Sequence, residues 1–517
     1  MSIDNRDWLP RVLPVDLGSN TVTREVQQPL VRGQDTTAII PSLQDDDSCK
    51  IKRRPRHRLP KLDCLPPIVV NSLTSALLVT VSWLSLVILC QRLRIVPHDL
   101  VLLIAMIIAS YLSGQLFLVC GLPQVVPMYL IGITYRSFNF LEDLRNWDVF
   151  SNLRYLAITV VLVKGGLAMD LKVLKKYPTQ VLKSSFIICT VEAMALTVAA
   201  NILLPDLFPP LWSFVFGFVN SPTSPTKFGS VLGGLKAKKR YNDTKMGAIW
   251  GFSAPVEIIY CISVFSTLLS IITRSGGGAV ETLFLGIAKV ALGFLAGTLW
   301  GLVVGYFPHK DDINCSAKRF TGLWLGVISI YFGAKSYGWG PGGPLGTFVG
   351  GISANTVWTA LNPTHKKTVL KTFNKMWDWV MEPMLFCLVG FEIDANNLPM
   401  SPSEVGLTVA ALFIGSLVRS FISVAVHYTS GFKPPEIVFL TVAGLPKATV
   451  QAAIAPQMLD LLRGKEDEER SKALIFSGIV SCFIFTTVST IILHIFGKRL
   501  LKTVRKPMPP TDNNNMP

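Results

Sequence analysis

Apolar runs long enough to cross a lipid bilayer recur along this chain, and they constrain its fold more than any other feature. About fourteen can be counted against the roughly twenty residues that a spanning helix needs. They lie near residues 68–90, 99–120, 124–137, 153–169, 179–203, 210–234, 244–273, 280–306, 319–337, 343–360, 376–393, 404–428, 434–459 and 472–496. Mean hydropathy is +0.45 and only 16% of residues are charged. Because lipid cannot satisfy a free backbone, the runs predict an all-α polytopic membrane protein with about 14 transmembrane helices.

The charge of the connecting loops indicates how these helices are oriented. With the N-terminus inside, three cytoplasmic loops are basic, namely 170–178, 236–245 and 362–375. Three outer loops are acidic or neutral, namely 139–148, 205–210 and 394–403. Only the outer loop 91–94, QRLR, departs from this pattern. Positive loops stay in the cytoplasm, so both termini are expected there. The net charge of +16 comes largely from these loops and the tails, and it predicts no nucleic-acid partner.

Two of the apolar segments are interrupted by proline near their centres. The sixth runs from Trp212 to Gly234 and contains Pro222 and Pro225, whereas the thirteenth runs from Ile437 to Leu459 and contains Pro446. A broken helix survives in a membrane only where its freed backbone groups line a polar cavity. The two segments are an odd number of spans apart, so they cross the membrane in opposite directions. The pattern therefore predicts inverted-topology repeats with two crossing discontinuous helices, as in secondary transporters.

These features divide the chain into three parts. We expect residues 1–62 to form a disordered cytoplasmic tail, because they are polar and contain prolines. Residues 63–497 form the predicted transmembrane transporter domain, with core helices at about 179–273 and 404–496, and residues 498–517 form a cytoplasmic C-terminal tail. A basic cluster ends the first tail, and it serves either as a topology signal or as a contact with anionic membrane lipid.

Charged side chains near the middle of a membrane segment are candidates for function, because each is costly to bury there. The core segments carry Glu192, Glu257, Arg419 and Lys447. Glu192 and Arg419 sit at equivalent places in the two repeats, and as a pair they either take part in coupling or hold the repeats together. Lys447 either carries protons or neutralises the negative end of a half-helix. Glu257 is the candidate for the proton- or ion-coupling group.

Polar side chains crowd the first break and predict a path for a small ion. They are Asn220, Ser221, Thr223, Ser224 and Thr226, followed by Lys227. Hydroxyls and unwound carbonyls can replace the water shell of an ion. The same groups can also serve as caps of the two half-helices. The nine cysteines follow no metal-ligand spacing and read as small core residues. No nucleophile–base constellation is visible, so we expect neither an enzyme nor a cofactor.

Several motifs resemble the animal NHA-type sodium/proton antiporters (solute carrier 9B-like) of the monovalent cation/proton antiporter superfamily. They are VLVKGGLAMDL at 161–171, TVEA at 190–193, GFVNSPTSP at 217–225, WDWVMEPMLFCLVGFEID at 377–394, LVRS at 417–420 and GLPKATVQAAIAP at 444–456. The resemblance implies a homodimer in which a core domain moves against a dimerisation domain. It also implies that Glu192 and Arg419 form the family's Glu–Arg pair, and that Lys447 is the lysine of the second broken helix.

The chain departs from that family at the ion site, where the resemblance implies two adjacent aspartates. Aligned without gaps, Glu257 takes the first position and Ile258 the second, whereas a shift of one residue would place Glu257 at the second position instead. In either register one carboxylate remains. The main expectation is an antiporter that exchanges protons for Na⁺ or Li⁺, with no metal site beyond a transient Na⁺ site at Glu257. One alternative is a proton-coupled chloride transporter, because Lys227, Arg419 and Lys447 leave the cavity more positive. Another is a transport-inactive homologue. Both plasma membrane and endomembrane fit the sequence.

Overall fold

The computed structural model describes residues 98–140, 147–224, 244–273, 279–307, 314–340, 342–361 and 363–502. Within these ranges every regular element is a helix, which confirms the all-α prediction. The first apolar segment, the tail 1–62, most of the tail 498–517, and Pro225, Thr226 and Lys227 lie outside the described residues.

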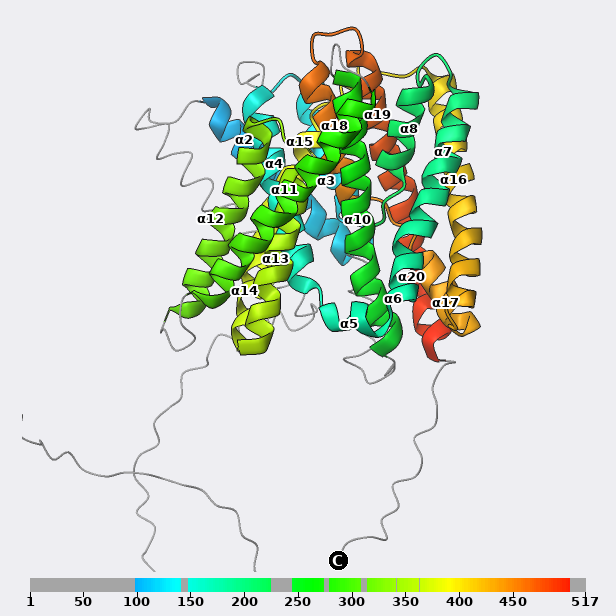
Figure 1. Cartoon of the computed structure of the whole chain (residues 1–517). Coiled ribbons are helices and arrows are strands. Elements are labelled where there is room, and N and C mark those ends of the chain that lie inside the picture. The colour runs from blue at the N-terminus through cyan, green and yellow to red at the C-terminus, as the bar shows by residue number, and fades with distance from the viewer. Residues whose placement is uncertain are drawn as a thin grey trace, which may run out of the picture. The chain divides into compact units, whose positions relative to one another are not determined.

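The described helices follow the predicted order (Figure 1). They are α2 His98–Val119, α3 Val125–Ser137, α4 Trp147–Ala168, α5 Leu171–Lys176, α6 Pro178–Leu182, η2 Lys183–Ile187, α7 Ile188–Leu203, α8 Pro210–Asn220, α10 Thr244–Thr273, α11 Ala279–Tyr306, α12 Cys315–Ser336, α13 Gly342–Leu361, α14 Pro363–Met376, η3 Trp377–Met381, α15 Glu382–Gly390, α16 Pro402–Thr429, α17 Pro434–Ala443, α18 Thr449–Leu462, α19 Glu468–Ser481, η4 Cys482–Thr486 and α20 Thr487–Lys502.

Seven helices in the described part are long and apolar enough to cross a membrane by themselves. Two of them run through π-helical turns without interruption, as α6–η2–α7 and α19–η4–α20. The third and tenth segments are also helical, as α3 and α13. With the shorter apolar helices α8 and α17, the described part is consistent with about fourteen crossings.

One of the expected cytoplasmic loops contains a helix. Residues 362–375 are basic and connect two apolar segments, and the structure forms α14 from Pro363 onward. Val369 and Phe373 explain the helix, because they lie four residues apart and are both fully buried. That spacing places them on one face of the helix, whereas Lys371 and Lys375 are exposed.

The two breaks meet in the middle of the protein. The first helix stops at Asn220 and leaves residues 221–224 outside any helix, whereas the second stops at Ala443 and resumes at Thr449. The backbone N–H of Ser224 donates to the carbonyl of Pro446 across a distance of 2.8 Å. The side chain of Gln451 donates to the carbonyl of Pro222 at 2.9 Å. Backbone groups freed at one break therefore find hydrogen-bond partners at or beside the other break. A membrane requires such partners, because lipid offers none.

The repeats also pack through their first helices. In Figure 1, α7 and α16 lie along each other, and they are in direct contact. A Cβ atom on Gly415 of α16 would come within 2.4 Å of Leu196 of α7, so these helices are in close contact there. Helix pairs in membranes gain their stability from such packing, because lipid supplies no hydrophobic drive between them.

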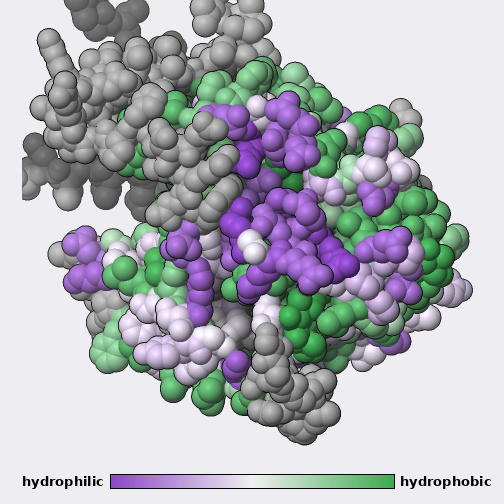
Figure 2. Space-filling view, turned by 90° about the horizontal axis from the view of Figure 1, so that it is seen from above, coloured by the Kyte–Doolittle hydropathy of each residue, from purple (hydrophilic) through white to green (hydrophobic). Residues whose placement is uncertain are grey.

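A second close seam joins α11 to α13. Gly293, Gly297 and Gly301 of α11 face backbone atoms of Gly342, Gly346 and Gly350 of α13, with a built Cβ at 2.1 to 2.5 Å from the facing carbonyl oxygens. The outer face of α11 carries exposed large side chains, among them Leu292, Leu295 and Leu299. Seen from above, hydrophilic residues gather in the middle of one end of the molecule and hydrophobic residues surround them (Figure 2). This arrangement suits a molecule with lipid around its sides.

We expect the α11–α13 seam to be sensitive to a single methyl group. Gly297→Ala would place a Cβ 2.1 Å from the carbonyl oxygen of Gly346, and the resulting overpacking should cost about 1–3 kcal/mol. Gly286→Ala on the same helix is the matched control, because its nearest neighbour is 3.7 Å away. The measurement is the apparent melting temperature of purified protein in detergent. Equal melting temperatures for the two variants would contradict the close approach.

Candidate functional site

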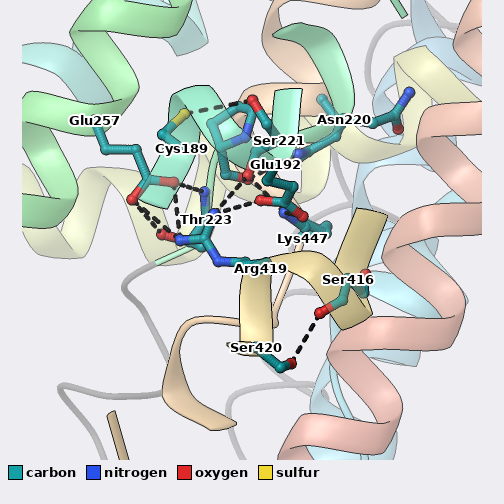
Figure 3. A network of polar contacts seen from close by, with 12 residues as sticks. Cys189, Glu192, Asn220, Ser221, Thr223, Glu257, Ser416, Arg419, Ser420 and Lys447 are labelled. Carbon is teal, nitrogen blue, oxygen red and sulfur yellow. Dashed lines mark hydrogen bonds and ion pairs between the residues drawn. The ribbon is translucent and has the colours of Figure 1, made fainter. Parts of the chain in front are cut away.

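Four charged side chains from four different segments meet where the two breaks cross (Figure 3). Glu192 comes from α7, Glu257 from α10, Arg419 from α16 and Lys447 from the break between α17 and α18. None is more than 3% exposed. The structure therefore brings together all four of the charged residues that the sequence singled out.

The four groups form a continuous chain of ion pairs. Arg419 lies at its centre, with Nη1 bonded to Oε2 of Glu192 and Nη2 at 3.1 and 3.2 Å from the two carboxylate oxygens of Glu257. Lys447 Nζ donates to the other oxygen of Glu192 at 2.7 Å. Two acids face two bases, so the cluster has no net formal charge. Such balance is what allows charges to remain buried, because an unpaired ion away from water is very costly.

The cluster also neutralises the end of the first half-helix. The carbonyl of Ser221, the C-cap residue of α8, accepts from Lys447 Nζ at 2.5 Å and from Arg419 Nη1 at 3.2 Å. The carboxyl end of a helix carries a partial negative charge, and both cations lie against it. Sequence reasoning gave Lys447 this role as one of two alternatives, and the contacts match it without deciding whether the lysine also carries protons.

The polar residues of the first break divide into two groups. Thr223 contacts Glu257 through its backbone N–H at 3.2 Å and its hydroxyl at 3.4 Å. Asn220 instead points away from Glu257, and its amide donates to the carbonyl of Phe216 and the hydroxyl of Ser477. Ser224 joins the second break through its backbone. Ser221 and Thr223 are thus two of the described path residues, and both touch the charged cluster.

A cavity of about 350 Å³ opens beside the cluster, between α4, α13 and α14 on one side and α10 and α18 on the other. Ile258 is among its lining residues, together with Lys164, Trp250, Asn374 and Thr449. The described lining includes no aspartate or glutamate. Glu257 lies next to Ile258 in sequence, but its carboxylate points to Arg419. The side chain at the expected position of the second acid therefore gives this cavity an apolar wall.

A second buried ion cluster was not predicted. Arg154 of α4 binds Glu392 at 2.7 Å and Asp460 at 2.5 Å, and Arg463 binds Glu392 at 2.9 Å. The rule about charges inside apolar segments gives only a weak signal for Arg154, because it is the second residue of the fourth segment at 153–169, although it lies two turns inside α4. Its partners Glu392 and Asp460 lie at the ends of apolar segments, where charged residues are common. Only the fold shows that they meet at Arg154.

Removal of Arg419 should destabilise the protein through the acids that it leaves behind. We expect Arg419→Met to cost about 3–5 kcal/mol, because Glu257 then loses the guanidinium that neutralises it in a buried place. Adding Glu257→Gln should recover part of this loss, since Glu192 and Lys447 then remain as a balanced pair. The measurement is the apparent melting temperature of each variant in detergent. A double variant that loses as much as the two single variants together would contradict the coupling.

Comparisons with known proteins agree with this architecture. The family model described as "Sodium/hydrogen exchanger, transmembrane" matches residues 76–495. The chain is 29% identical over 414 residues to sodium/hydrogen exchanger 9B2 of Xenopus tropicalis, covering 77% of this chain and 74% of that protein. It is 32% identical over 396 residues to sodium/hydrogen exchanger 9B2 of Homo sapiens, covering 74% and 70%.

A solved structure extends the agreement to the fold. The sodium proton antiporter MjNhaP1 of Methanocaldococcus jannaschii superposes with a TM-score of 0.63 at 14% identity, over 78% of this chain and 97% of that one. At this identity the likeness concerns the fold alone. The match of the family model over most of the chain, with the curated relatives beside it, shows that this protein belongs to the transmembrane sodium/hydrogen exchanger family.

Proposed function

We propose that this protein exchanges protons for Na⁺ or Li⁺ across a membrane, and that both ions compete for the carboxylate of Glu257. The observation that carries the proposal is the place of this carboxylate: it is buried at the crossing of the two breaks, within reach of Arg419 and Thr223. Membership of a family of proton-coupled cation antiporters supports the same class of transport.

The ion pairs suggest how one acid can serve both ions. A proton or a cation at Glu257 neutralises its charge and releases Arg419, which keeps Glu192 as a second partner. The hydroxyl of Thr223, already 3.4 Å from Glu257, and nearby break carbonyls would supply neutral oxygen ligands to a small cation. The two loaded states then carry the same formal charge. One-for-one exchange at this site would move no net charge across the membrane.

A second candidate function rests on the lining of the cavity. Lys164 is among its lining residues, none of the described ones is acidic, and the N-terminal residues Thr449 and Val450 of α18 also line it. A helix N-terminus favours anions. Proton-coupled chloride transport is therefore the alternative, and a transport-inactive homologue is the third reading. We further propose a homodimer, which the resemblance implies. From the charge of the loops, we propose that both termini are cytoplasmic, in a lipid bilayer that is either the plasma membrane or an endomembrane.

Glu257→Gln should abolish coupled flux, because a neutral amide neither binds a proton in this pH range nor attracts a cation. The measurement is proton flux in proteoliposomes with a pH-sensitive dye, driven in turn by Na⁺, Li⁺ and Cl⁻ gradients. Glu404→Gln, which alters a partly exposed acid in the capping box at the start of α16, is the control and should keep its flux. Normal flux in Glu257→Gln would refute the role of this acid. Flux driven by Cl⁻ that persists without Na⁺ would favour the second candidate.

Ile258→Asp should strengthen the dependence on Na⁺, because it adds a carboxylate to the cavity wall next to Glu257. We expect half-maximal flux at roughly tenfold lower Na⁺, which corresponds to about 1.4 kcal/mol of added binding. Ile262→Asp is the matched control, since Ile262 lines the same cavity one helical turn further along α10. Unchanged Na⁺ dependence in Ile258→Asp, or an equal gain in both variants, would argue against an ion site at this position.

A further inference from the structure

We propose that Cys189 and Cys261 form a reversible oxidation site, in which a hydroperoxide joins the two thiols in a disulfide and thereby stops coupling at Glu257. The chemistry of this site is independent of which ion the protein carries. Only the expected effect on transport rests on the function proposed above.

The two thiols already lie in contact. Cys189 is on α7 and Cys261 on α10, both are fully buried, and their Sγ atoms are 3.1 Å apart. A disulfide needs a sulfur–sulfur distance of about 2.05 Å, so the two atoms have to approach by roughly one ångström. Both cysteines are free thiols in this structure. The two cysteines are 72 positions apart in sequence, yet their sulfur atoms need only a small further movement to form a bond.

The thiols belong to the same polar network as the charged cluster (Figure 3). The hydroxyl of Ser221 lies 3.4 Å from Sγ of Cys189 and 3.6 Å from Sγ of Cys261. The carbonyl of the same serine accepts from Lys447 and Arg419. One residue therefore connects the thiol pair with the cations that balance the two acids.

Helical spacing adds a second connection. Cys189 precedes Glu192 by three residues on α7, and Cys261 follows Glu257 by four residues on α10. Residues at these separations lie on the same face of a helix, one turn apart. A bond between the sulfurs would tie α7 to α10 one turn from each acid, and it would fix the distance between the two helices. Exchange at Glu257 requires its carboxylate to leave Arg419, which a fixed pair of helices opposes.

The reaction balances with a hydroperoxide as the oxidant. The thiolate of one cysteine attacks the peroxide O–O bond, forms a sulfenic acid, and releases water or an alcohol. The second thiol attacks the sulfenic sulfur, the S–S bond forms, and a water molecule leaves with the second oxygen. Two electrons and two protons pass from the thiols to the peroxide, and a dithiol reverses the change by thiol–disulfide exchange. Neither thiol lines the cavity, but Ile258 and Ile262, which flank Cys261 in sequence, do, so the proposed route for the peroxide runs through this cavity and past these side chains.

The test uses the full-length protein in liposomes, treated with hydrogen peroxide and then with dithiothreitol. Peptide mapping by mass spectrometry without reduction should recover the segments that contain Cys189 and Cys261 as one cross-linked species. Ion-driven proton flux, measured on the same vesicles, should fall to a small fraction of its untreated value. Dithiothreitol should remove the cross-link and restore the flux.

Cys261→Ser and Cys189→Ser should each keep their own untreated flux after peroxide. The matched control is Cys387→Ser, because Cys387 is a buried thiol that contacts the backbone of Met384 and should leave peroxide sensitivity intact. Oxidation of the exposed Cys120 without the cross-link would overturn the proposal, as would a cross-link that leaves flux unchanged. A wild-type protein without flux of any ion would count against the proposed function alone, because the presence or absence of the cross-link would still show whether the two thiols form a disulfide.

Discussion

The bridge that Arg419 makes between Glu192 and Glu257 is the interaction on which the rest of this structure depends. A single guanidinium holds one acid from each of two helices and also reaches the carbonyl at the end of α8. Its planar fork suits this task, because it presents several donors in fixed directions and stays charged in the protein interior. Lys447 completes the balance from the second break. Without this neutral set, four charges could not lie at the centre of a membrane protein.

The fold serves to bring these groups to one place. Each break frees backbone groups that lipid cannot satisfy, and the hydrogen bonds from Ser224 to Pro446 and from Gln451 to Pro222 show how the breaks supply each other. Gly415 packs against the side chain of Leu196, and the glycines of the α11–α13 seam pack against facing backbone atoms. These close contacts hold the helices that surround the small, polar centre.

The helices and the charged residues of the site could be predicted from the sequence, because a membrane restricts the structures that a chain can adopt within it. Apolar length and loop charge led to the helices and their order, and the cost of buried charge singled out Glu192, Glu257, Arg419 and Lys447. The partners of Arg154 and the contact of Cys189 with Cys261 could not be predicted, since they depend on helix rotation and on approach between distant segments. The helix at 363–376 was missed because its lysines signalled a loop more strongly than its buried face signalled a helix. The rotation of α10 also could not be predicted, so only the structure shows that Ile258 faces the cavity while Glu257 faces Arg419.

In the proposed function, Ile258 stands where the resemblance implies a second acid, so coupling depends on Glu257, and the protonation of this acid can be observed directly. Infrared difference spectroscopy of the protein in lipid, on addition of Na⁺ at constant pH, should show a protonated carboxylic acid losing its proton. This signal should appear in the wild-type protein and be absent from Glu257→Gln. A signal that persists in Glu257→Gln, or a wild-type protein in which Na⁺ deprotonates no carboxylic acid, would contradict it.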